Sequence, residues 1–248
     1  MRTIALRREQ TAQGPLILVN AAHPLTGGPA PELTAPDALH PKILLERQAA
    51  HLLDACVRAA GGWRAIVPVS GWRSLAEQRF LWADTWDREG EDFTRKYVAL
   101  PRCSEHQTGL AVDLGERAEH IDFIRPRFPE DGVCGRFRRL AADHGFIQRY
   151  RREKESLTGI AEEPWHFRYV GVPHARLLED SGLCLEEYGD FLRERPRTCV
   201  LSNGRRVTVS YLSCAGGGVE LELPEDACFQ VSGHNDGGFI VTRWEAVS

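Results

Sequence analysis

From Ser104 to Asp113 the sequence reads Ser-Glu-His-Gln-Thr-Gly-Leu-Ala-Val-Asp. The apolar run 110–114 predicts a short core strand. A carboxylate at Asp113 has no packing value at the end of such a run, so it indicates a chemical role. Gly109 lets the chain bend ahead of the strand, and His106 can then approach the same point. The segment therefore predicts a strand that brings a His–Asp pair into one site.

A second segment, fifty residues later, reads Glu163-Pro164-Trp165-His166-Phe167-Arg168-Tyr169. Pro164 disfavours a helical backbone at the residue before it, so Glu163 and His166 are not an ordinary i, i+3 helical pair. A turn that enters a strand over 166–170 is expected instead. Such a turn aims both side chains into one cleft.

These two segments together contain the groups that a catalytic zinc site needs. That site requires three protein ligands, an open position for water, and a nearby base that is not a ligand. The four side chains are His106, Asp113, His166 and Glu163. Taken singly, each signal is weak, because a satisfied polar residue near a turn is the far more common explanation.

The neighbouring sequence predicts helices and strands that would hold these segments. Ser74 is a suitable N-cap for a helix through Trp86, with Glu77 at the capping-box position. The remaining expected elements are a strand running into a loop over 15–25, a helix over 42–60 that ends at Gly61-Gly62, a strand over 65–69, a helix over 135–144 that ends at Gly145, and helices over 173–180 and 185–194. Charged loops are expected over 86–103 and 149–162, the latter with a solvated basic run that includes Arg149.

The character of the sequence changes after residue 195. Asn203-Gly204 is a strong hairpin signal between strands expected over 199–202 and 206–212, and two more strands are expected over 219–223 and 239–244. We therefore predict a main domain over residues 1–195 and a small β module over residues 196–248, to which we assign no role.

Composition bounds the function further. The formal net charge of the chain is -4, with basic and acidic residues interspersed, so a nucleic-acid partner is not expected. No apolar run near the N-terminus is long enough for a signal peptide or a membrane span, which predicts a cytoplasmic protein. The seven scattered cysteines contain no C-x-x-C pair and are expected to be reduced thiols.

The wording of the two segments, together with Ser70-Gly71-Trp72-Arg73-Ser74 and Gln78, closely resembles the zinc D,D-carboxypeptidase and D,D-dipeptidase family known from vancomycin resistance, the VanY and VanXY types. A Tyr is more usual in that family where Trp72 stands. The resemblance covers roughly residues 15–195. It implies an α+β fold with a small antiparallel sheet and flanking helices, in which the β module looks like an extension of some VanXY-type members.

The resemblance also implies a role for each site residue. The zinc ligands carry over to His106, Asp113 and His166, and the general base to Glu163. Arg73, Gln78 and Ser104 match positions that line the substrate site, and Arg73 is suited either to oxyanion stabilisation or to clamping a terminal carboxylate. Independently of the resemblance, Trp165 is expected to form a wall of the site. Glu105 would point away from the metal in an extended segment, so it is expected at the surface or behind the metal ligands.

The expected reaction is zinc-dependent hydrolysis of D-Ala-D-Ala, as the free dipeptide or at the end of a peptidoglycan precursor. An L,D-carboxypeptidase or another peptidoglycan peptidase with the same zinc site is the nearest alternative. A non-catalytic module that binds wall peptides is a further alternative, although it would need no base at Glu163. The sequence does not define the oligomeric state.

Overall fold

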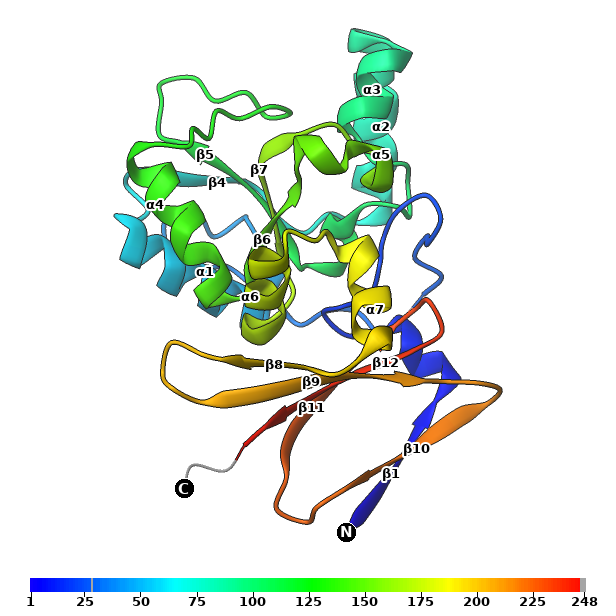
Figure 1. Cartoon of the computed structure of the whole chain (residues 1–248). Coiled ribbons are helices and arrows are strands. Elements are labelled where there is room, and N and C mark those ends of the chain that lie inside the picture. The colour runs from blue at the N-terminus through cyan, green and yellow to red at the C-terminus, as the bar shows by residue number, and fades with distance from the viewer. Residues whose placement is uncertain (28, 246–248) are drawn as a thin grey trace. The chain divides into compact units, whose positions relative to one another are not determined.

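The computed structural model describes residues 1–27 and 29–245, and these form two compact units (Figure 1). The central unit comprises Val19–Ala175, and the terminal unit comprises Met1–Leu18 with the chain from Arg176 onward. The chain combines helices with small antiparallel sheets, which confirms the expected α+β class.

A four-stranded antiparallel sheet organises the central unit. Its strands, in spatial order, are β4 (Ile66–Ser70), β5 (Ala111–Glu116), β7 (Glu163–Tyr169) and β6 (Phe146–Tyr150). The strands expected around β4, β5 and β7 are present, whereas β6 was not expected. The sheet places the two motif segments on neighbouring strands, because β5 pairs directly with β7.

Two helices, α1 (Arg47–Ala60) and α4 (Gly132–Ala141), complete the core of the central unit. The buried side chains of α1 recur at helical spacing, at Ala49, Leu53, Cys56 and Ala60. They share one apolar cluster with Phe137 of α4 and with residues of β4, β5 and β7. The helix begins later than expected because the Glu46 side chain accepts hydrogen bonds from the first turn.

Helix α2 (Leu75–Glu89) follows β4 directly. The expected capping box is present, since Ser74 Oγ accepts from the Glu77 amide while the Glu77 carboxylate accepts from the Ser74 amide. The expected loop over 86–103 is largely helical, because α2 runs on to Glu89 and α3 (Glu91–Tyr97) follows after a turn at Gly90. The irregular part of this segment is therefore limited to about 98–103.

The remaining elements of the central unit are short. They are β2 (Leu33–Thr34), β3 (Leu45–Glu46), 3-10 turns at Glu105–Thr108, Ala142–His144 and Arg152–Lys154, and helix α5 (Glu155–Thr158). Helix α6 (Val172–Ser181) extends from the central unit into the terminal unit.

The terminal unit contains a four-stranded sheet, in the order β11 (Cys228–His234), β12 (Gly238–Trp244), β9 (Arg206–Ser213) and β8 (Arg197–Val200). The expected hairpin at Asn203-Gly204 joins β8 to β9. A separate ribbon pairs β1 (Arg2–Arg7) with β10 (Gly218–Leu223). The other elements are a 3-10 turn at Arg8–Ala12 and helix α7 (Leu185–Glu194), which contacts β9.

The division into compact units does not coincide with the boundary expected at residue 195. Strand β1 belongs with the C-terminal strands because its partner is β10, and α7 belongs there because it contacts β9. The prediction of a strand at the start of 15–25 is wrong, because the backbone there is irregular. The Leu16 amide donates to Ser232 Oγ and the Leu18 amide to Asn235 Oδ1, so side chains satisfy a backbone that pairs with no strand.

All seven cysteines are free, as expected from their spacing. No helix in the described part of the chain combines the length and apolar character that crossing a membrane requires.

Candidate active site

The pairing of β5 with β7 brings the two motif segments together. Asp113 lies directly opposite His166 in the antiparallel register, and Ser70 of β4 lies opposite Asp113 from the other side. Residues opposed in this way have Cβ atoms about 5 Å apart. The sheet itself therefore juxtaposes a carboxylate and an imidazole that are far apart in the sequence.

His106 reaches the same point from the 3-10 turn that precedes β5. Gly109 ends this turn in the left-handed conformation, with φ of 75°, and an added Cβ would lie 2.9 Å from the Glu46 amide nitrogen. Only glycine meets both requirements without strain. The bend predicted at Gly109 is thus present, and it directs His106 back towards Asp113.

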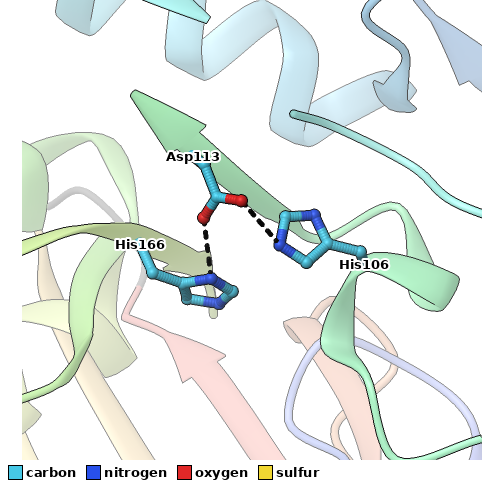
Figure 2. Close-up of side chains that lie close together, drawn as sticks. All are labelled: His106, Asp113 and His166. Atoms are coloured by element: carbon cyan, nitrogen blue, oxygen red, sulfur yellow. Dashed lines mark hydrogen bonds and ion pairs between the residues drawn. The ribbon is translucent and has the colours of Figure 1, made fainter. Parts of the chain in front are cut away.

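The three side chains face one another in a compact group (Figure 2). His106 Nε2 lies 3.2 Å from Asp113 Oδ2, and His166 Nδ1 lies 3.0 Å from Asp113 Oδ1. One ligand atom from each residue falls within 4.8 Å of the others, and all three residues are buried. Two imidazole nitrogens and one carboxylate oxygen form a donor set that suits zinc.

Hydrogen bonds fix which ring nitrogen each histidine offers. His106 Nδ1 donates to the Gly71 carbonyl oxygen at 2.7 Å, which leaves Nε2 for a metal. His166 Nε2 lies 3.4 Å from Glu105 Oε2, which leaves Nδ1. The second nitrogen of each ring thus has an oxygen partner, as is usual for metal-binding histidines.

Glu163 stands beside this group without being one of its three members. Its Oε2 lies 3.6 Å from His166 Nδ1, and the side chain is buried at the start of β7. Burial raises the pKa of Glu163 to about 8, against the partial opposition of His166. A carboxyl group with a pKa near neutrality is suited to accept and then return a proton.

The two histidines differ in their protonation without a metal. Burial tends to lower the pKa of His166, but hydrogen bonds to Asp113 and Glu105 outweigh it and raise the pKa to about 9. Burial and the positive charge of Arg73 instead lower the pKa of His106 to about 4. The pKa of Asp113 stays below its ordinary value, because the two histidines overcome the cost of its burial. A metal bound at His166 Nδ1 therefore has to displace a proton.

Arg73 provides a cation at the edge of the group. Its guanidinium NH2 lies 3.9 Å from Asp113 Oδ2, and the side chain is largely buried. Burial lowers the pKa of Arg73, although Asp113 and Glu163 oppose this. No hydrogen-bond partner for its Nε lies within the described residues. Arg73 is thus placed to bind an anion beside the three-residue group.

A pocket opens over the group, and most of the expected site residues line it. Ser104 and Trp165 are both buried in its wall, together with Arg73 and Glu163. Gln78 does not line this pocket: it is fully buried, and its Nε2 donates to the Ala99 carbonyl at 2.8 Å. Gln78 therefore supports the wall at Ala99 from behind instead of facing the pocket.

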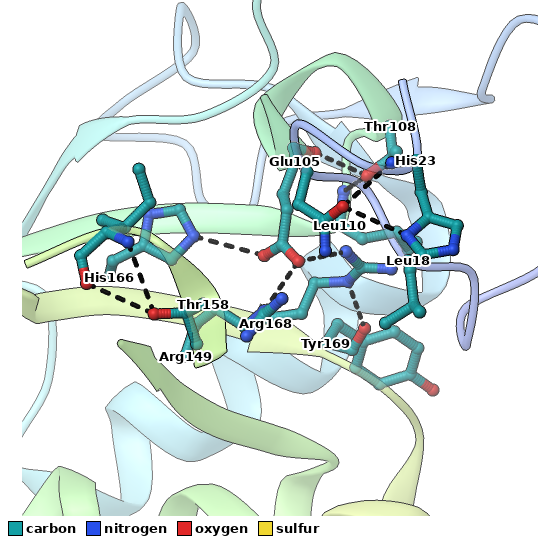
Figure 3. A network of polar contacts seen from close by, with 12 residues as sticks. Leu18, His23, Glu105, Thr108, Leu110, Arg149, Thr158, His166, Arg168 and Tyr169 are labelled. Atoms are coloured by element: carbon teal, nitrogen blue, oxygen red, sulfur yellow. Dashed lines mark hydrogen bonds and ion pairs between the residues drawn. The ribbon is translucent and has the colours of Figure 1, made fainter. Parts of the chain in front are cut away.

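Sequence reasoning missed a buried charge cluster behind His166 (Figure 3). Glu105 lies between Arg149 and Arg168, and none of the three side chains is exposed. The solvated loop expected at Arg149 is therefore wrong for that residue. A usable signal was present in Arg168, because it is two residues from His166 in a strand and must lie on the same face.

Comparison with known proteins agrees with this geometry. A family model described as VanY, D-alanyl-D-alanine carboxypeptidase, matches residues 42–172. The bifunctional D-Ala-D-Ala dipeptidase and carboxypeptidase VanXYC of Enterococcus gallinarum is 40% identical over 185 residues, which cover 73% of this chain and 97% of that protein.

Solved structures extend the likeness to the whole chain. The D,D-dipeptidase VanXYg in complex with a D-Ala-D-Ala phosphinate analogue matches with a TM-score of 0.95 and 44% identity, covering 98% of this chain and 99% of that one. An E175A mutant of the D,D-pentapeptidase VanY in complex with Zn(II) matches with a TM-score of 0.58 and 29% identity, covering 70% and 98%. The L,D-carboxypeptidase LdcB matches at a TM-score of 0.56. The chain therefore belongs to the VanY family of D-alanyl-D-alanine carboxypeptidases.

Proposed function

We propose that this protein is a zinc-dependent D,D-peptidase that hydrolyses D-Ala-D-Ala, both as the free dipeptide and at the end of peptidoglycan precursors. The observation that carries the proposal is the convergence of His106, Asp113 and His166, with Glu163 next to His166 Nδ1. Similarity over nearly the full chain to a D,D-dipeptidase bound to a D-Ala-D-Ala analogue supports the choice of substrate.

The residues present fit a zinc ion. His106 would offer Nε2, His166 would offer Nδ1, and Asp113 would offer one carboxylate oxygen. A zinc ion in such a site lowers the pKa of water and polarises a carbonyl group. A VanY structure determined with Zn(II) supports the choice of metal.

The side chains around this donor set then transfer the proton, bind the negative charge and exclude water. Glu163 takes the proton from the attacking water and delivers it to the departing amine, for which its raised pKa is suited. Arg73 binds a negative charge, either the oxyanion or the terminal carboxylate of the substrate. Ser104 can add a neutral hydrogen bond, and Trp165 excludes water from one side of the pocket.

A second cavity supports activity on longer substrates. Its volume is about 260 Å³, and it shares Val98, Ala99, Tyr150 and Ile160 with the wall of the first pocket. It therefore offers room for the residues that precede D-Ala-D-Ala in a pentapeptide. The likeness to a bifunctional dipeptidase and carboxypeptidase favours the same dual range here. A cytoplasmic location, where free dipeptide and soluble precursors are made, also remains a prediction.

Hydrolysis assays test the proposal directly. Purified protein is incubated with D-Ala-D-Ala, with a pentapeptide ending in D-Ala-D-Ala, and with a tetrapeptide ending in an L,D bond. We expect release of D-Ala from the first two, loss of activity with a chelator, and recovery with added zinc. Cleavage of the L,D bond alone would make the protein an L,D-carboxypeptidase. Tight peptide binding without any hydrolysis would make it a binding module.

A matched variant separates the metal site from the base. Glu163→Gln should retain zinc, measured by elemental analysis, and lose at least about 100-fold in kcat, because a positioned base contributes that much or more. A variant that loses zinc together with activity would place Glu163 among the ligands instead.

A further inference from the structure

Behind the donor set, one carboxylate connects a candidate metal ligand to two buried arginines (Figure 3). Glu105 Oε1 lies 2.8 Å from Arg149 Nε and 2.9 Å from Arg168 NH1. Its other oxygen, Oε2, lies 3.4 Å from His166 Nε2. The two carboxylate oxygens therefore have different partners: Oε1 faces the two arginines, and Oε2 faces His166.

Bulk solvent does not reach these contacts. The side chains of Glu105, Arg149 and Arg168 are completely buried, and that of His166 is 4% exposed. A charged group in such surroundings is stable only with its specific partners in place. Each element supplies one partner: the turn before β5 supplies Glu105, β6 supplies Arg149, and β7 supplies Arg168.

We infer that Glu105 is a positioning residue for the metal site, which holds the His166 ring with its proton on Nε2 so that Nδ1 is directed at the metal. Arg149 and Arg168 in turn fix the carboxylate by occupying Oε1. This inference rests on the proposed zinc site. It goes beyond that site because it assigns a function to three residues outside the donor set, of which only Glu105 reaches the wall of the pocket.

His106 and His166 are held in place by different kinds of group. His106 is fixed by the backbone carbonyl of Gly71, which no side-chain substitution removes. His166 is fixed by a side chain that is itself held by two others. The orientation of His166 therefore depends on the charge cluster, whereas that of His106 does not.

Replacing Glu105 with Gln provides a sharp test, because the amide has the same shape as the carboxylate. Arg149 Nε donates to Oε1 and the Arg168 guanidinium forms an ion pair with the same oxygen, so the amide oxygen should take that place and the NH2 group should face His166 Nε2. Two donors then oppose each other, which favours the ring form with its proton on Nδ1, where the metal has to bind. We expect the zinc Kd, measured by competition with a chelator, to rise about 10- to 100-fold.

Asp54→Asn is the matched control. Asp54 also pairs with an arginine, Arg58, at 2.8 Å, and accepts a hydrogen bond from Trp63 Nε1 at 2.7 Å. Asp54→Asn makes the same change from carboxylate to amide, but its partners Arg58 and Trp63 are not members of the donor set. Its zinc Kd should equal that of the wild type. Equal losses in both variants would assign the effect to general destabilisation and overturn the inference, as would an unchanged Kd in E105Q.

A measurement on the wild-type protein keeps the test valid if E105Q does not fold. In protein loaded with Co²⁺, proton NMR should show two paramagnetically shifted ring N–H signals that exchange slowly with water, one for His106 Nδ1–H and one for His166 Nε2–H. A single protected signal would overturn the inference. If the wild type binds neither zinc nor cobalt, the proposed function fails first, and the two failures are thereby distinguished.

Discussion

Replacing Glu163 with Gln should stabilise the metal-free protein at neutral pH. Burial raises the pKa of Glu163 from 4.5 to about 8, so between these values the folded state binds more protons than the unfolded state. The stability of the wild type therefore falls as the pH rises through this window. At pH 7 the cost is about 3 kcal/mol, from about 1.4 kcal/mol for each pH unit above 4.5. Gln is neutral throughout and lacks this cost.

Urea unfolding in the presence of a chelator, at pH 5, 6 and 7, measures this difference. Tryptophan fluorescence follows mainly the central unit, since only Trp244 lies in the terminal unit. The advantage of Glu163→Gln should grow by about 1.4 kcal/mol per pH unit. Glu153→Gln, at an exposed position, should show no such trend. A stability difference that is the same at pH 5 and pH 7 would refute the argument that Glu163 is held in a desolvated site.

Four further predictions follow from the site and its supports. Because the pKa of His166 is raised to about 9, zinc must displace its proton, and the zinc Kd should fall about tenfold per pH unit from pH 6 to 8; calorimetry showing a pH-independent Kd would contradict this. Arg73→Ala should lower kcat/KM, and steady-state kinetics should show whether KM changes, which assigns Arg73 to carboxylate binding, or kcat, which assigns it to the oxyanion. Gly109→Ala should cost about 1–3 kcal/mol of stability, because its Cβ would meet the Glu46 amide at a positive φ; an unchanged Tm would show that the turn adapts. Leu100→Trp should fill the second cavity and raise KM for the pentapeptide alone; an equal effect on the dipeptide would remove that cavity from the substrate path.

Local physics explains the parts of the fold that the sequence predicts well. The capping box at Ser74 and the hairpin at Asn203-Gly204 depend on hydrogen bonds and backbone angles within a few residues. Both the capping box and the hairpin can therefore be predicted without knowledge of the rest of the chain. The register that sets Asp113 opposite His166 is different, because those residues are 53 apart in the sequence. Only the resemblance of the two motif segments to a known family indicated that the two side chains lie together.

The two missed strands β6 and β1 have a shared physical cause in long-range pairing. Strand β6 was missed because Gln148 and Arg149 interrupt its apolar pattern, and the buried Arg149 forms an ion pair with Glu105, which lies 44 residues away in the sequence. Strand β1 was missed because its partner, β10, lies near the other end of the sequence. In each case the stabilising contact comes from a distant segment, which periodicity within a short window does not reveal.

The ribbon of β1 and β10 also has a consequence for how the protein is made. Residues 2–7 are synthesised before the central unit, but their partner strand is synthesised about 200 residues later. At typical elongation rates β1 therefore waits roughly 10–40 s without its partner, while every residue of the central unit emerges in between. The central unit can complete its core during translation, whereas the terminal unit can close only afterwards. A synonymous-codon change that slows elongation between 176 and 218 should lengthen the exposure of β1 to proteases and chaperones without altering the folded enzyme.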